Sequence, residues 1–337
     1  MEQNLRNLCE TYLKHRDTVK KAFPWESSYF YPVCASILTD RGFMGDAEAL
    51  KQCNQLLKEK TSVFSNFRGS SRLAMISMMA ASADPEETLR RAMCVHDALK
   101  EVFFGSSYLP VASMILAQTI EEYRFETVAT RTRTLYNLMK KEHPFLTSRE
   151  DSVYAAMLAL SPETDDRIIG ETEECYNIIK QTFHSPNAVQ SLSHALALIE
   201  GAASEKCERT ARLFCILKER GYRYGTEYEL PTLGVLANLP LPTEKVADLL
   251  IEVADWLKGK PGYGIMGMNK TQRLMHAGML VTGSVTGGTQ LMQSAAVSGT
   301  VSQIAAQQAS MIAAQNAAMC AAIAASTAAA AASNAAH

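Results

Sequence analysis

Six polar residues in the middle of the chain have types and a spacing that could support chemistry. They form two groups, which are His143, Thr147 and Asp151, and then Asn187, Gln190 and His194. If the two groups converge, they could form a small polar binding pocket, or a His and Asp pair for acid–base catalysis. The same residue types also cap helices and satisfy buried backbone groups, so a purely structural role stays open.

The rest of the sequence offers little other chemistry. Phosphate-binding motifs of the GxGxxG and GxxxxGK[ST] types are absent, as is the HExxH zinc motif, and the glycine-rich stretch GKPGYGIMGMNK (259–270) is typical of a connector. Cys94 and His96 stand two apart on a predicted helix, so they point away from each other and cannot easily share a metal ion. Ser193 and His194 also point apart, and no Ser-His-Asp triad is predicted. We expect no metal, no cofactor and no catalytic residue.

Composition narrows the class of protein. Among 337 residues, 33 basic residues stand against 35 acidic ones, so no overall charge favours nucleic acid or an anionic membrane. The basic stretch ATRTRTLYNLMKK (129–141) is interpreted as a solvated helix face, because Arg131 and Arg133 point to different sides. The charged N-terminus has no apolar core of a signal peptide, and the eight cysteines form no CxxC pair. We therefore expect a cytoplasmic protein with reduced thiols.

The elements that position the polar residues follow a repeat. An aromatic residue followed by turn residues and Ser or Thr recurs about every 40 residues, anchored on Trp25, Phe67, Phe104, Phe145, Phe183, Tyr222 and Tyr263. After each turn comes a short apolar helix rich in small residues, and then a longer amphipathic helix such as PEETLRRAMCVHDALKEVFF (85–104). The sequence predicts an all-α fold, an α-solenoid of about six helical hairpins over residues 1–283. The six polar residues would lie at the starts of neighbouring inner helices.

Several stretches carry a family resemblance. These are HPFLTSREDSVYAAMLAL (143–160), ETEECYNIIKQTF (171–183), NAVQSLSHALAL (187–198), CERTARLFCILKERGYRY (207–224) and LGVLANLP (233–240). They resemble a bacterial family known as domain of unknown function 4003, over roughly residues 10–285. The resemblance implies a cytoplasmic helical protein from Firmicute-type bacteria with an Ala/Gln-rich tail, and it implies no activity. Pro186 stands where the family usually has glycine, so a flexible glycine at that turn is not expected here.

Residues 284–337 form a second region, rich in Ala, Ser and Gln, and no charged residue follows Arg273. Alanine is the best helix former, so a helix over roughly 289–332 is predicted. The amides Gln307, Gln308, Gln315 and Asn316 interrupt it, and the apolar remainder is shorter than a membrane span. Three alternatives stay open for this tail: docking on the helical body, association with the tail of a second chain, or disorder.

These patterns favour a non-enzymatic protein-interaction scaffold that uses a groove of the array and a tail that self-associates or docks. Its partner would be another protein or a second copy of the chain, with no nucleic acid and no membrane span. The alternative is a sensor that binds a small ligand or peptide near His143, Asp151 and His194. A third hypothesis is an enzyme of unfamiliar type that uses the same residues.

Overall fold

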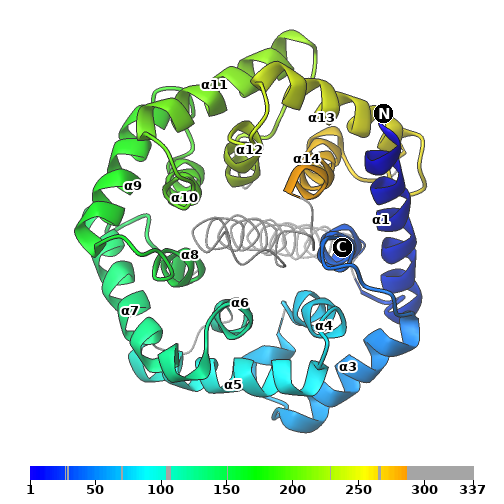
Figure 1. Cartoon of the computed structure of the whole chain (residues 1–337), viewed down its shortest axis with the longest axis vertical. Coiled ribbons are helices and arrows are strands. Elements are labelled where there is room, and N and C mark those ends of the chain that lie inside the picture. Colours follow the sequence, from blue (N-terminus) through cyan, green and yellow to red (C-terminus); the bar gives the residue numbers. More distant parts are fainter. Residues whose placement is uncertain are drawn as a thin grey trace, which may run out of the picture.

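The chain folds into a ring of helices arranged in two layers (Figure 1). The computed structural model describes residues 1–286, except 27, 29, 70, 104–107, 150, 228 and 265–266. Within these residues an outer layer holds α1 (Gln3–Ala22), α3 (Ala47–Lys60), α5 (Pro85–Val102), α7 (Phe125–Glu142), α9 (Asp165–Ile179), α11 (Ala203–Glu219) and α13 (Thr243–Lys258). The inner layer holds α2 (Phe30–Asp40), α4 (Arg72–Ala80), α6 (Leu109–Thr119), α8 (Asp151–Leu158), α10 (Pro186–Ala197), α12 (Leu230–Ala237) and α14 (Lys270–Thr286).

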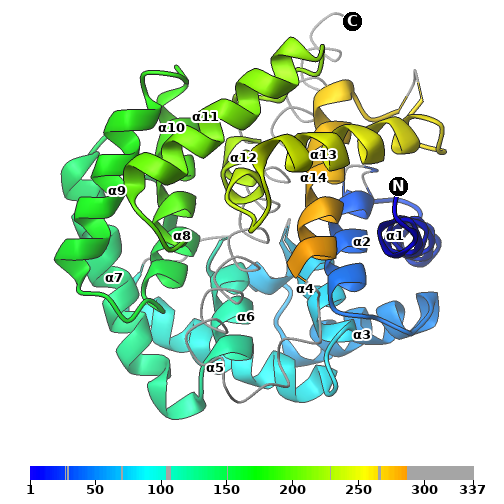
Figure 2. The same cartoon turned by 45° about the horizontal axis from the view of Figure 1, so that its top comes forward.

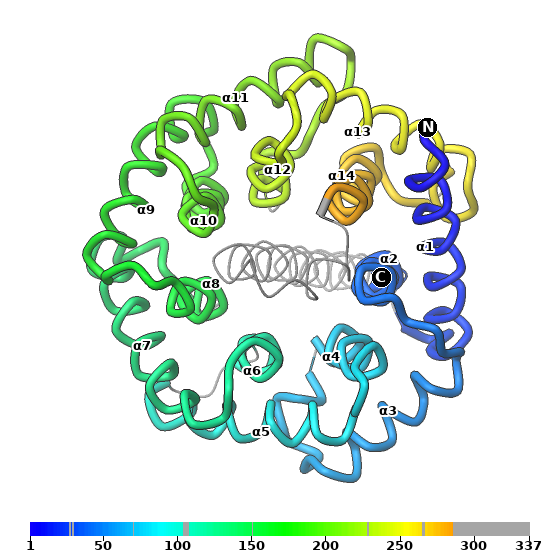
Figure 3. The backbone as a smooth tube through the Cα atoms, viewed as in Figure 1, coloured from blue at the N-terminus to red at the C-terminus, as the bar shows by residue number. Residues whose placement is uncertain are grey.

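The all-helical prediction is confirmed, but the α-solenoid of about six hairpins is not. The described helices form seven outer–inner pairs, and the last inner helix, α14, packs against both α1 and α2. The tube view follows the chain around the ring until α14 lies beside α2 (Figure 3). Helix α14 continues to Thr286, just beyond the predicted boundary at 283, and residues 287–337 lie outside the described part of the chain.

Residue type decides which helices are inner and which are outer. The outer helices are amphipathic: in α5 the buried residues Leu89, Ala92, Val95, His96 and Leu99 recur every three or four positions on one face. The inner helices are buried on every side: in α6 each residue from Leu109 to Ala117 is buried. Burying a Leu or Met side chain stabilises the fold by about 1.5–3 kcal/mol, so both layers contribute to the hydrophobic stabilisation of the ring.

The inner helices run side by side around the ring in the same direction (Figure 2). Two pairs of contacts between α8 and α10 show this direction, because Thr147 pairs with Gln190 while Asp151, four residues on, lies against His194. The described parts of the turns that lead from outer to inner helices therefore lie toward one face of the ring. We call this the entry face, and the opposite face, where inner helices lead to outer ones, the exit face.

Ion pairs and arginine caps tie the outer helices to their neighbours. The end of α3 meets the start of α5 through Lys60 and Glu86, 2.6 Å apart, and Arg220 of α11 meets Asp248 of α13. Arg209 of α11 donates to three backbone carbonyls at the end of α12 at 2.8–2.9 Å. Arg91 and Arg131 likewise donate to backbone carbonyls at and after the ends of α6 and α8. A helix end leaves carbonyls without partners, and a guanidinium can satisfy several of them at once.

The seam between the first and last hairpins closes through a buried polar chain. The Tyr12 hydroxyl of α1 lies 2.6 Å from the Tyr263 hydroxyl, which lies 3.0 Å from Nδ1 of His276 on α14. Arg16 of α1 donates to the carbonyl of Pro261 at 2.6 Å, and the N-terminal ammonium pairs with Glu252 of α13. Side chains more than 200 residues apart in the sequence thus hold the ring shut.

Candidate functional site

Four of the six predicted site residues come together between α8 and α10. Nε2 of Gln190 donates to Oγ1 of Thr147 at 2.8 Å, and Oδ1 of Asp151 lies 3.6 Å from Nδ1 of His194. All four side chains are buried. They meet because the turn that carries Thr147 leads directly into α8, which runs parallel to the neighbouring α10. We call these four residues the polar cluster.

His143 and Asn187 do not join the polar cluster. Nε2 of His143 pairs with Oε1 of Glu173 on α9 at 2.9 Å, and its ring lies over Tyr176 with the centroids 4.3 Å apart. Asn187 lies exposed in the first turn of α10. The helix that carries Asn187 begins at Pro186, as its proline predicts, but Ser185 gives no capping bond and donates instead to Glu227 at 2.7 Å.

The polar cluster combines satisfied groups with one that lacks a partner. The backbone N–H of Ser148 donates to Oδ2 of Asp151 at 2.7 Å, which is half of a capping box, and Thr147 donates to the carbonyl of Met139. Ser193 donates to the carbonyl of Gln190, so its hydroxyl is tied into its own helix. Nδ1 of His194 has no hydrogen-bond partner among the described residues. One buried imidazole nitrogen of the cluster therefore lacks a partner among the described residues, while the hydroxyls of Thr147 and Ser193 donate to the backbone.

A separate cavity of about 290 Å³ opens at the seam of the ring, where sequence reasoning expected only a connector. Its walls include Arg16, Lys20, Tyr31 and the loop that leads from α13 to α14. This loop needs its glycines: Gly262 has φ +83°, and a Cβ on Gly267 would lie 2.2 Å from the carbonyl oxygen of Gly262. Nothing in the local sequence links Arg16 to this loop, because closure of the ring alone brings them together.

The entry face bears three aromatic side chains in almost full contact with solvent. Trp25, Phe64 and Phe145 are 97%, 96% and 100% exposed. Each stands three or four residues after the end of an outer helix, α1, α3 or α7, in a turn that leads to the next inner helix. The sequence repeat is anchored on Trp25 and Phe145 as well as on Phe67 and Phe183. Phe67 and Phe183 are buried, whereas Trp25 and Phe145 are exposed. The spacing of the aromatic residues therefore could not tell core from surface.

The basic stretch of α7 differs from its interpretation as a solvated face. Arg131 pairs with Asp165 at 2.8 Å and donates to carbonyls at the end of α8, so it acts as a helix cap. Arg133 lies over the rings of Phe103 and Tyr136, with centroid distances of 5.1 and 5.7 Å. Both guanidinium groups are engaged within the protein, and neither belongs to a free basic track.

Most cysteine and histidine side chains in the described part of the chain are buried in the core. The ring of His96 packs edge-on against Phe67 at 5.0 Å, whereas Cys94 stands partly exposed on another side of α5. Burial raises the pKa of Cys9 and of Cys34 to about 12, so both stay protonated thiols. Among the residues placed by the structure, no three His, Cys, Asp or Glu side chains lie close enough to hold a metal ion.

These features define a closed, two-layered ring of helices with a buried polar cluster, a seam cavity and an aromatic entry face. No described helix is long and apolar enough to cross a bilayer. The model of the family described as protein of unknown function, DUF4003, matches residues 16–309, and the chain belongs to this family. No curated protein and no solved structure matches the chain.

Proposed function

We propose that the protein is a non-enzymatic interaction scaffold whose entry face docks a partner protein. The proposal rests on one observation, the nearly complete exposure of Trp25, Phe64 and Phe145. A large aromatic side chain in full contact with solvent can anchor a partner protein, because aromatic residues are among those that dominate binding energy at interfaces. A closed ring offers two faces and an outer wall in place of the concave groove of an open array.

The partner we propose is a protein with apolar pockets that receive these three rings. The three turns belong to the first, second and fourth hairpins, so the rings spread over about half of the entry face. Charged residues stand near two of the rings in the sequence, Lys60 and Arg68 near Phe64 and Arg149 near Phe145. Aromatic anchors within a polar rim are the usual anatomy of a protein–protein interface.

A matched pair of variants tests this role. The protein in which Trp25, Phe64 and Phe145 are all changed to serine loses the partner, because each buried aromatic anchor contributes about 2 kcal/mol or more, roughly 30-fold in Kd. The control changes Met44 and Tyr123 to serine, since both are exposed in turns of the exit face. Co-purification from the producing bacterium with each variant identifies proteins that depend on the entry face.

Binding is then measured with the purified partner. Trp256→Phe leaves Trp25 as the single tryptophan of the chain, and its emission shifts to the blue when the partner covers it. A partner retained equally by the triple variant refutes the proposal. So does an entry face that only pairs two copies of this chain, detected by light scattering, or that binds anionic vesicles instead of protein.

A second candidate is a sensor in which the polar cluster binds a small polar ligand. The observation in its favour is His194, whose buried Nδ1 lacks a hydrogen-bond partner among the described residues and faces Asp151 at 3.6 Å. A ligand that binds the native state raises the melting temperature. Thermal-shift screening of metabolites and peptides tests this role, with His194→Gln as the site variant and the exposed Asn187→Ala as the control. A shift that survives His194→Gln argues against this site.

A further inference from the structure

The packing of the seven inner helices leaves a space along the axis of the ring. Each of the seven pairs of neighbouring inner helices is in contact, and among the described residues no comparable contact joins inner helices across the ring. Packed helices lie about 8–10 Å apart, so seven in a ring place their axes about 9–11.5 Å from the centre. One further helix with small side chains fits that space at ordinary packing distance.

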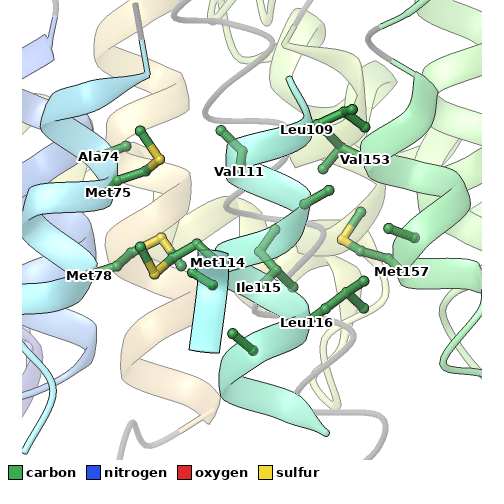
Figure 4. Packing of buried hydrophobic residues seen from close by; sticks show 14 of the residues in the cluster. Ala74, Met75, Met78, Leu109, Val111, Met114, Ile115, Leu116, Val153 and Met157 are labelled. Carbon is green, nitrogen blue, oxygen red and sulfur yellow. The ribbon is translucent and has the colours of Figure 1, made fainter. Parts of the chain in front are cut away.

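The burial of the inner helices shows that this centre is covered. Each inner helix has one side toward the ring axis, yet every residue of α8 and every residue from Leu109 to Ala117 of α6 is buried. Figure 4 shows such side chains on α4, α6 and α8, with Met78 and Met114 meeting between the first two. Described residues from across the ring do not supply the cover, because opposite inner helices make no extensive contact.

Two buried methionines of α14 have few apolar neighbours among the described residues. Met275 and Met279 stand one helical turn apart and are 3% and 0% exposed. Yet they form a cluster of their own and belong to neither of the two large apolar clusters of the ring. Side chains this well buried need apolar neighbours, and the described residues provide few beyond the two methionines themselves.

We propose that residues 317–333 of this same chain, a stretch without Gln, Asn or Gly, run through the ring as a central helix and complete its core. The other residues outside the description are at most four in a row, whereas residues 287–337 form one long segment. The 30 residues 287–316 join this stretch to the end of α14 at one mouth of the ring, which is enough chain to reach either mouth. The inner helices α2 and α14 have 11 and 17 residues, so the 17 residues 317–333 are enough to span the ring at 1.5 Å per residue.

The chemistry of the segment matches that of the ring. No charged residue follows Arg273, and alanine dominates the sequence, so a central helix would be thin and uncharged. The inner helices also carry no Lys, Arg, Asp or Glu between their end turns. The buried hydroxyls of Ser71 and Thr232 lack hydrogen-bond partners among the described residues, and the hydroxyls of Ser326, Thr327 and Ser333 in the segment can supply them. This proposal is independent of the entry face, and its test requires no partner.

Cys320 gives a direct test in the unmodified full-length protein. It is the single cysteine after Arg273, so trypsin places it alone in the fragment 274–337. The exposed Cys215 serves as the internal reference. With iodoacetamide at neutral pH, Cys320 reacts roughly 100-fold more slowly than Cys215 or slower still, because a thiol in the ring is reached only when the structure opens. Light scattering of the same full-length protein should show a monomer.

A charge placed in the segment provides the second variant. Ala318→Asp lies next to Cys320 in the proposed central helix, so it brings the labelling rate within about tenfold of that of Cys215 and lowers the melting temperature. Ala335→Asp lies beyond the proposed helix and leaves both quantities unchanged. Labelling of wild-type Cys320 at the rate of Cys215 overturns the proposal. Protection that accompanies a dimer overturns it as well, because the segment then pairs between chains.

Discussion

Acid should loosen the seam of the ring through His276. This side chain is 3% exposed, and burial lowers its pKa to about 3 from an ordinary value of 6.5. The unfolded chain therefore takes up a proton at a pH where the folded chain does not. The stability that neutral His276 contributes is fully present above pH 6.5 and is lost as the pH falls toward 3. Each pH unit in that window costs about 1.36 kcal/mol, so the loss at pH 4.5 is about 2.7 kcal/mol.

The measurement compares wild type with His276→Gln by urea unfolding at pH 8 and pH 4.5. A difference between two proteins is needed because Asp40 titrates in the opposite sense over the same range. Burial raises the pKa of Asp40 to about 7, so its contribution favours folding as the pH falls. That contribution is common to both proteins and cancels. The advantage of wild type over the variant should shrink by about 2.7 kcal/mol between pH 8 and pH 4.5.

A control separates titration from hydrogen bonding. Tyr263→Phe removes the hydroxyl that meets His276 but leaves the imidazole buried. This variant should lose stability by about 1 kcal/mol and keep the pH dependence of wild type. If the difference between wild type and His276→Gln is the same at both pH values, His276 is not a buried neutral histidine in the folded protein. The account of the seam is then wrong.

Three further predictions concern packing, caps and buried charge. Gly234→Ala should lower the free energy of unfolding by about 1–3 kcal/mol, because the new Cβ would lie 2.4 Å from a methyl group of Leu192. Gly170→Ala meets no atom within 4 Å, so it should stabilise α9 by about 0.5–1 kcal/mol. Thermal unfolding of the two variants compares these effects. Arg209→Met should lower the free energy of unfolding in urea by about 2–3 kcal/mol, because three backbone carbonyls lose their donor. The control Arg212→Met loses one exposed ion pair and should lower it by less than about 1 kcal/mol. Asp40→Asn should raise the free energy of unfolding by about 2–4 kcal/mol at pH 8 and leave it nearly unchanged at pH 4; an equal effect at both pH values contradicts the burial of its charge.

The polar cluster shows how far sequence reasoning reached toward the site. Repeat spacing placed Thr147, Asp151, Gln190 and His194 at corresponding positions of adjacent hairpins, and the structure brings these four together. It does not bring in His143, because the last turn of α7 directs that side chain toward Glu173 on the neighbouring outer helix. Whether a residue at a helix end points inward or outward depends on packing, which its position in a repeat does not specify.

The sequence by itself determined that the chain is helical, that short apolar helices alternate with longer amphipathic ones, and where most turns fall. Those properties depend on residues a few positions apart, such as the spacing of Leu89, Ala92 and Leu99 on one face. Only the tertiary structure decided that the hairpins close into a ring, that Arg131 caps a neighbouring helix, and that Phe67 is buried while Phe145 is exposed. A ring closes through the small rotation between hairpins, added up around the whole molecule. No local pattern encodes that sum, and contacts such as Tyr12 with Tyr263 exist only once it reaches a full turn.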